Sequence, residues 1–391
     1  MAQRRRTRSA TRVPLTELTQ RAVGTIAGMA LQFTMLAVAV AFLVFFGQRF
    51  GLFGDEISLA VTSAANLTPG EARSVELFTL LPKDAIRSID DPNFVAAADV
   101  TLAASTPIIG VAVGSDARAY PLAVLASHEI VNDIVGGRPL AVTYCPLCLT
   151  GIVFDRHVEG TVVEFGVSGK LLMNVLVMYD RQTDSLWSQI LGESIEGQRK
   201  GAKLEVVDSL QTTWGTWRQL HPATLVLASD IRSDSYAGYY QNNDSGVHGN
   251  FVDDDRLPAK SIVVGAVVGS SPRAYPLALG ADFSVVNDVL EDVPLLAVFA
   301  PDGLTGLLYD RRIDGRLLTF TDAGPQVALE MIDQETESRW NRLTGEAIAG
   351  PLRGNVLQRI PATTSFWFGW RDFFPRTTVF GIDAGQPPDS S

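Results

Sequence analysis

The stretch Val113–Ala123 reads VGSDARAYPLA, and it returns as VGSSPRAYPLA at Val268–Ala278, 155 positions later. Other segments recur at nearly the same distance, which is the sign of an internal repeat. Among them are VND at 131–133 and 286–288, LTG at 149–151 and 304–306, Trp187 and Trp340, and Trp217 and Trp370, the last two pairs at a distance of 153. The sequence therefore predicts two similar units, a first half at residues 107–228 and a second half at residues 261–381, the latter degenerate.

Each half has mainly the pattern of strands. IIGVAVG at 108–114 and IVVGAVVG at 262–269 are β-branched runs that end in glycine. Glu159-Gly160 and Asp314-Gly315 separate alternating segments, a hairpin signal because glycine readily adopts positive φ. Helices are expected only within residues 121–134 and 212–220. We predict a mainly β fold with a few helices (α+β), in which two internally duplicated halves pack as a pseudo-twofold body.

Two further segments flank these halves. Residues 229–260 are rich in Asp, Asn, Ser and Tyr, and this composition predicts a connecting loop. Residues 57–106 show no clear periodicity. We expect them to form an N-terminal extension that lies on the duplicated body.

Residues 25–46 read TIAGMALQFTMLAVAVAFLVFF and carry no charge. A helix that rises about 1.5 Å per residue would span roughly 33 Å here, enough for a hydrocarbon core of about 30 Å. A cleaved signal peptide is the alternative, but its apolar region normally has only about 7 to 15 residues. We therefore predict one N-terminal transmembrane helix.

The charges around this span predict its orientation. The basic tail at residues 1–24 holds one acid, Glu17, and six arginines: Arg4, Arg5, Arg6, Arg8, Arg12 and Arg21. Positive residues favour the cytoplasmic side, so we expect a single-pass cell-membrane protein with a cytoplasmic N-terminus and an extracytoplasmic body. The net charge of −11 argues against nucleic acid as a partner, and protein partners are not indicated.

A comparison of the halves separates the residues that both retain from those that one has lost. Asn132, Asp155, Arg156, Asp180 and Trp187 all recur in the second half, and we expect them to support the shared fold. Four residues with metal or redox chemistry do not recur. Cys145, Cys148, His128 and His221 correspond to Ala300, Gly303, Phe283 and Phe374.

Cys145 and Cys148 are the only cysteines of the chain, and they lie in the sequence YCPLC. Two thiolates at this spacing can hold one metal ion, and imidazole is a common additional ligand for zinc, copper or iron. We therefore predict a metal site formed by His128, Cys145 and Cys148, completed by His221 or water.

Three alternatives to this metal site remain open. The cysteines can instead cycle between dithiol and disulfide, with His128 lowering a thiol pKa. They can also form an inert disulfide in a non-catalytic scaffold that binds a ligand or partner, although closing so short a loop would stabilise the fold by only about 2 kcal/mol. Hydrolysis by Asp155 with Asp180 is disfavoured, because both acids recur in the degenerate half.

Five motifs in order resemble those of a known family: HEIVND at 128–133, YCPLC at 144–148, FGVSGKL at 165–171, MYDRQTDSLWSQ at 178–189 and SFWFGW at 365–370. The chain resembles the family called domain of unknown function 3179, over most of its length beyond the predicted span. The resemblance implies that the protein is exported or membrane-attached, and it implies no activity. Members often place glycine after the second cysteine, where this chain has Leu149.

Overall fold

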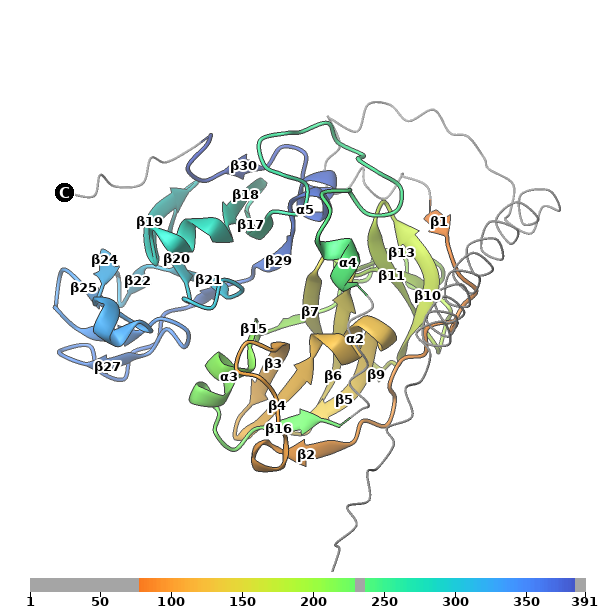
Figure 1. Ribbon diagram of the computed structural model, residues 1–391, viewed down its shortest axis with the longest axis horizontal. Coiled ribbons are helices and arrows are strands. Elements are labelled where there is room, and N and C mark those ends of the chain that lie inside the picture. The colour runs from red at the N-terminus through yellow and green to blue at the C-terminus, as the bar shows by residue number, and fades with distance from the viewer. Residues whose placement is uncertain (1–76, 229–235, 384–391) are drawn as a thin grey trace, which may run out of the picture. The chain divides into compact units, whose positions relative to one another are not determined.

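Strands dominate residues 77–228 and 236–383, which are the residues that the computed structural model describes (Figure 1). Of these residues, 45% lie in strands and 12% in helices, so the predicted mainly β fold is confirmed. They all belong to one compact unit, residues 60–391. The predicted tail and transmembrane span lie outside the described residues. Within the described part, no helix is long and apolar enough to cross a membrane.

The first half contributes three sheets. One has the order β15-β3-β4-β16-β2, another β14-β7-β6-β5, and the third β1-β10-β11-β12-β13. The strands are β1 (Leu77–Thr79), β2 (Phe94–Ala96), β3 (Pro107–Val113), β4 (Asp116–Pro121), β5 (Ile130–Val135), β6 (Arg138–Cys145), β7 (Thr150–Asp155), β10 (Phe165–Leu172), β11 (Val175–Asp180), β12 (Leu186–Ser188), β13 (Glu193–Glu196), β14 (Val206–Val207), β15 (Ser209–Thr213) and β16 (Leu225–Leu227). The described part of residues 57–106 supplies β1 and β2, which pair at the edges of two of these sheets.

The second half repeats this order of strands. Its sheets run β29-β17-β18-β30, β19-β20-β21-β28 and β24-β25-β26-β27. The strands are β17 (Ile262–Val268), β18 (Ser271–Pro276), β19 (Val285–Leu290), β20 (Val293–Phe299), β21 (Gly306–Asp310), β24 (Phe320–Asp322), β25 (Glu330–Asp333), β26 (Arg339–Asn341), β27 (Ala347–Ala349), β28 (Arg359–Ile360), β29 (Thr363–Phe366) and β30 (Thr378–Val379). Each sheet thus matches one of the first half strand for strand, apart from the edge strands β1 and β2.

Two short hairpins form where the sequence predicted them. They pair β8 (His157–Val158) with β9 (Thr161–Val162), and β22 (Arg312–Ile313) with β23 (Arg316–Leu317). In the first, Glu159 and Gly160 have φ of 50° and 79°; in the second, Asp314 and Gly315 have 49° and 76°. Both turns need positive φ at two successive residues, and glycine meets this need at the second.

A glycine in each first strand makes room for a tryptophan. A Cβ atom added at Gly110 of β3 would lie 2.3 Å from the ring of Trp217, and one at Gly265 of β17 would lie 2.4 Å from Trp370. These rings belong to α3 (Trp214–Leu220) and α5 (Trp367–Phe373). The paired Gly and Trp positions therefore fix each helix against its sheet.

The polar residues that recur in both halves have the structural roles expected of them. Asn132 binds both backbone groups of Phe165, and Asn287 binds those of Phe320 in the same way. Buried Asp180 accepts a hydrogen bond of 2.9 Å from the indole of Trp187. The corresponding carboxylate and indole in the second half, Asp333 and Trp340, are 2.8 Å apart.

Two helical features differ from expectation. The helix predicted within residues 121–134 is α2 (Leu122–His128), which ends early because Glu129 adopts φ of 58° and β5 follows at once. The connector predicted as a loop contains the helix α4 (Ala237–Tyr240). The side chain of Tyr239 in α4 donates to the carbonyl of Leu147, so this segment covers the cysteine loop.

The halves share their interior. The hydroxyl of Thr150 in β7 donates to that of Ser365 in β29 at 3.0 Å, and the amide of Phe366 donates to the carbonyl of Cys148 at 2.8 Å. The same apolar cluster holds both cysteines and Trp367 of the second half. The turn that carries the cysteines is therefore built by both halves.

Candidate functional site

Cys145 and Cys148 lie at the two ends of the turn that joins β6 to β7, at the edge of strand pairing. The two residues form a close pair, separated by 3.1 Å, and no disulfide joins them. Their exposed fractions are 2% and 0%, so a reagent must enter the protein to reach either sulfur.

The environment of Cys145 favours its thiolate. Burial acts to raise the pKa of this thiol, but hydrogen bonds from the Cys148 side chain and from the backbone of Cys148, Leu176 and Leu147 outweigh it and lower the pKa. Donors that point at a sulfur atom stabilise its negative charge. Cys145 is therefore the better nucleophile of the pair.

The environment of Cys148 has the opposite effect. Burial raises the pKa of the Cys148 thiol well above its usual range, and its hydrogen bond to Cys145 raises it further. Cys148 thus keeps its proton, and its Sγ donates to the carbonyl of Cys145 at 3.9 Å. Of the two thiols, Cys145 is therefore the one that ionises more readily.

The turn that carries the cysteines is held in a strained conformation just after Cys148. Leu149 has φ of 57° although it is neither glycine nor asparagine, and its side chain is buried. Such a conformation persists only where the surroundings impose it. Here the carbonyl of Cys148 accepts from the Phe366 amide and, at 3.2 Å, from the Ser365 hydroxyl, while Tyr239 binds the carbonyl of Leu147 at 2.8 Å.

Glu129 is a residue of this site that the sequence analysis missed. Its exposed fraction is 9%, and its carbonyl accepts from the amide of Tyr144 at 2.8 Å, next to Cys145. Burial, and then the negative charge of Cys145, raise the pKa of this carboxyl to about 8. It corresponds to Ser284 in the second half, so the same comparison that selected the cysteines could have selected Glu129.

A family model with the description "Protein of unknown function (DUF3179)" matches residues 83–377. The chain belongs to the DUF3179 family. The match spans both halves and every residue of the thiol site, which confirms the resemblance seen in the five motifs. No curated protein and no solved structure matches this DUF3179 chain.

The two histidines of the predicted metal site each have another partner in this DUF3179 protein. Nδ1 of His128 makes a hydrogen bond of 2.8 Å with the carbonyl of Arg87. The ring of His221 stacks on Trp217 at a centroid distance of 4.1 Å. In the part of the chain that the structure describes, no three His, Cys, Asp or Glu side chains are grouped to hold a metal ion. The four-residue metal site stays a prediction.

A pocket of about 330 Å³ adjoins the cysteine turn of the DUF3179 protein. Tyr144, which precedes the first cysteine, and Leu149, which follows the second, both line it. The hydroxyls of Tyr144 and Tyr240 are 3.1 Å apart. The pocket therefore lies next to the turn that holds the buried thiols. Its walls are mainly apolar, and two of its lining residues, Tyr144 and Tyr240, carry phenol hydroxyls.

Proposed function

We propose that Cys145 and Cys148 are a redox-active pair that cycles between dithiol and disulfide. The observation that carries this proposal is the 3.1 Å approach of the two side chains. One sulfur receives hydrogen bonds and the other donates one, so nucleophile and resolving thiol are already distinguished. Membership of the DUF3179 family adds no activity to this argument.

The reaction partner that fits is a small disulfide. The Cys145 thiolate attacks one sulfur of this reagent, and the S–S bond of the reagent breaks and releases a thiolate. Cys148 then gives up its proton and attacks the sulfur of Cys145, which releases the second thiolate. The protein loses two electrons and the reagent gains them. The proton of Cys148 passes to one of the two released thiolates, so charge and atoms balance.

Burial of the sulfurs restricts the kind of reagent. A disulfide on the surface of another protein would not reach two residues that are 2% and 0% exposed. Small reagents can enter through the adjoining pocket after a modest movement of the turn.

The proposal is tested by redox titration of the full chain. The protein is equilibrated in buffers that range from reduced to oxidised glutathione, acid-quenched and alkylated, and its free thiols are counted by mass spectrometry. We expect both thiols to disappear together in a single two-electron transition. Cys145→Ser and Cys148→Ser should each abolish that transition. Thiols that stay free in oxidised glutathione, in a correctly folded protein, would contradict the proposal.

The same samples decide between the remaining alternatives. Metal bound at one ion per chain after anaerobic purification, and lost in His128→Ala and Cys145→Ser, would support the predicted site of His128, Cys145, Cys148 and His221 instead. The absence of both metal and thiol oxidation would support a binding scaffold.

We further propose that residues 25–46 anchor the chain in the cell membrane with the body on the outer side. The apolar length and the preceding arginines support this orientation. An extracytoplasmic location also suits a thiol pair that becomes oxidised. Resistance of the chain to alkaline carbonate extraction, together with digestion of its body by protease added to spheroplasts, is the expected result.

We also propose that the two halves descend from one duplicated unit and form a pseudo-twofold pair. The matching order of their sheets and the matched contacts of Asn132 and Asn287 support this origin. The second half then retained the fold after losing the thiols.

A further inference from the structure

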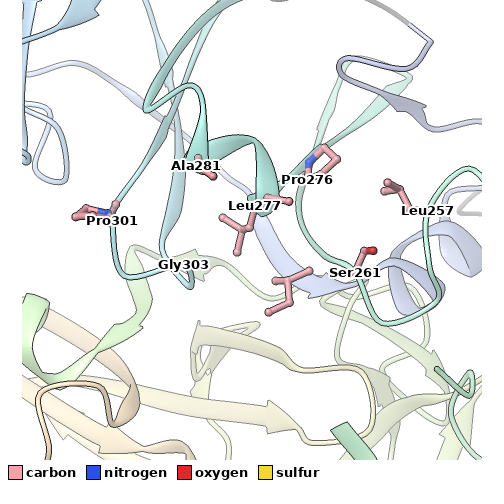
Figure 2. A pocket seen from close by; sticks show the side chains of 11 residues that line it. Leu257, Ser261, Pro276, Leu277, Ala281, Pro301 and Gly303 are labelled. Carbon is pink, nitrogen blue, oxygen red and sulfur yellow. The ribbon is translucent and has the colours of Figure 1, made fainter. Parts of the chain in front are cut away.

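The second half contains a pocket at the place that corresponds to the cysteine turn. It encloses about 450 Å³, and its lining includes Ala300 and Gly303, which correspond to Cys145 and Cys148 (Figure 2). A Cβ atom added at Gly303 would meet no atom within 4 Å. The positions that carry cysteines in the first half thus carry small residues at the wall of this pocket, and Gly303 is exposed.

The walls of this pocket are almost entirely apolar. In Figure 2 the side chain of Leu277 lies between Pro301 on one side and Leu257 on the other. Ser261 supplies the one hydroxyl group among the described lining residues. A volume of several hundred Å³ with such walls is typical of a site for a small apolar molecule.

The pocket shares a wall residue with its counterpart in the first half. Ile262 lines both the 450 Å³ pocket and the 330 Å³ pocket beside the cysteine turn. Lys260, two residues before it, lines the latter together with the phenol ring of Tyr144. The two spaces thus offer an apolar compartment next to one that holds a positive charge.

The positive charge of Lys260 determines which ligand head group the 330 Å³ pocket would accept. Nζ of Lys260 donates to the carbonyl of Tyr239 and to the side chain of Asn242, and it lies over the Tyr239 ring at 3.3 Å from the centroid. Its positive charge is thus held at the edge of this pocket. Among the described residues that line the two pockets, none carries a carboxylate. An anionic oxygen is therefore favoured there over a cation.

We propose that the paired pockets bind a free fatty acid, with its carboxylate at Lys260 and its hydrocarbon chain beyond Ile262 in the second half. This site is separate from the thiol chemistry and does not depend on it. It assigns a ligand to the half that has lost its cysteines.

Titration calorimetry of the full chain with dodecanoate, below its micelle concentration, tests this assignment. We expect one binding event, and much weaker binding of dodecyltrimethylammonium, which has the same chain length and the opposite charge. Ala281→Trp introduces a large ring at an exposed residue of the second pocket and should weaken dodecanoate binding by at least about tenfold. Ala103→Trp, at an exposed residue outside both pockets, is the matched control and should leave binding unchanged.

Lys260→Gln tests the head group. Loss of a charge-assisted hydrogen bond should weaken dodecanoate binding by about tenfold and reduce the preference over the cationic detergent. Cys145→Ser should bind dodecanoate like the unmodified protein, so a failure of the thiol proposal would not affect this result. No binding, equal binding of both detergents, or unchanged affinity in Ala281→Trp would each overturn the inference.

Discussion

Replacement of Glu129 by glutamine should stabilise this protein near neutral pH, although it removes a residue of the thiol site. Glutamine has nearly the shape of the protonated carboxyl and carries no charge. The exposed fraction of Glu129 is only 9%, and the negative charge of Cys145 lies close by. An ionised carboxylate at this position is therefore unfavourable, and the substitution removes that cost.

The magnitude follows from the pKa. Burial and the Cys145 charge raise the pKa of Glu129 from 4.5 to about 8. Below pH 4.5 the carboxyl is protonated in both the folded and the unfolded chain, so ionisation costs nothing. As the pH rises from 4.5 to 8, the unfolded chain ionises freely while the folded chain does not. Each pH unit then lowers the free energy of unfolding by about 1.4 kcal/mol, which amounts to about 3 kcal/mol at pH 7.

Urea unfolding of the full chain between pH 4.5 and pH 8 measures this effect. We expect Glu129→Gln to match the unmodified protein near pH 4.5 and to exceed its stability by up to about 3 kcal/mol at pH 7. Cys145→Ser should remove only part of the pH dependence, because burial is the larger cause of the shift. A stability difference that does not change with pH would refute the reasoning, since it would reflect altered packing and not ionisation.

Three further predictions concern single substitutions. Gly110→Ala should destabilise the fold by about 3 kcal/mol or more in urea unfolding, because the new Cβ would overlap the ring of Trp217. Gly238→Ala is the control. Its new Cβ meets no atom within 4 Å, so the free energy of unfolding should change by less than about 1 kcal/mol. Trp187→Phe and Trp340→Phe should each lower the free energy of unfolding by about 1 to 3 kcal/mol, because each removes a hydrogen-bond donor from a buried carboxylate. A large loss in one variant and none in the other would show that the two tryptophans do not have equivalent roles. Tyr239→Phe should speed alkylation of the thiols by iodoacetamide, followed by mass spectrometry, since it frees one carbonyl of the cysteine turn; an unchanged rate would show that this contact does not hold the turn closed.

The strand pattern and both hairpins could be predicted because their causes are local. Glu159-Gly160 and Asp314-Gly315 need only their own backbone preferences to form a turn. The end of α2 could not be predicted in this way. Its apolar pattern runs on into β5, and the residue that stops the helix is Glu129, which has no special preference for positive φ.

The candidate site shows the same limit. The two halves differ at both His128 and Glu129. Imidazole is the more common partner of cysteine in metal and redox sites, so the sequence favours His128. In the structure Nδ1 of His128 binds the carbonyl of Arg87, whereas the carboxyl of Glu129 lies within the electrostatic reach of Cys145. His128 ends α2, and Glu129 turns the chain with φ of 58° before β5 begins, so the two adjacent side chains meet different neighbours. The spacing of residues in the sequence does not show which of these two side chains lies near Cys145.

The distribution of strain argues that the thiol site is maintained for a function. In the first half, Leu149 takes up the positive φ of the cysteine turn, and Glu129 combines a positive φ with a buried carboxyl. In the second half a glycine, Gly303, has the positive φ of the corresponding turn, and Ser284 replaces the acid. The second half shows that this fold forms without either unfavourable feature. Their persistence beside the cysteines therefore needs a reason other than folding, and an ionisable pair of thiols with a carboxyl beside it supplies one.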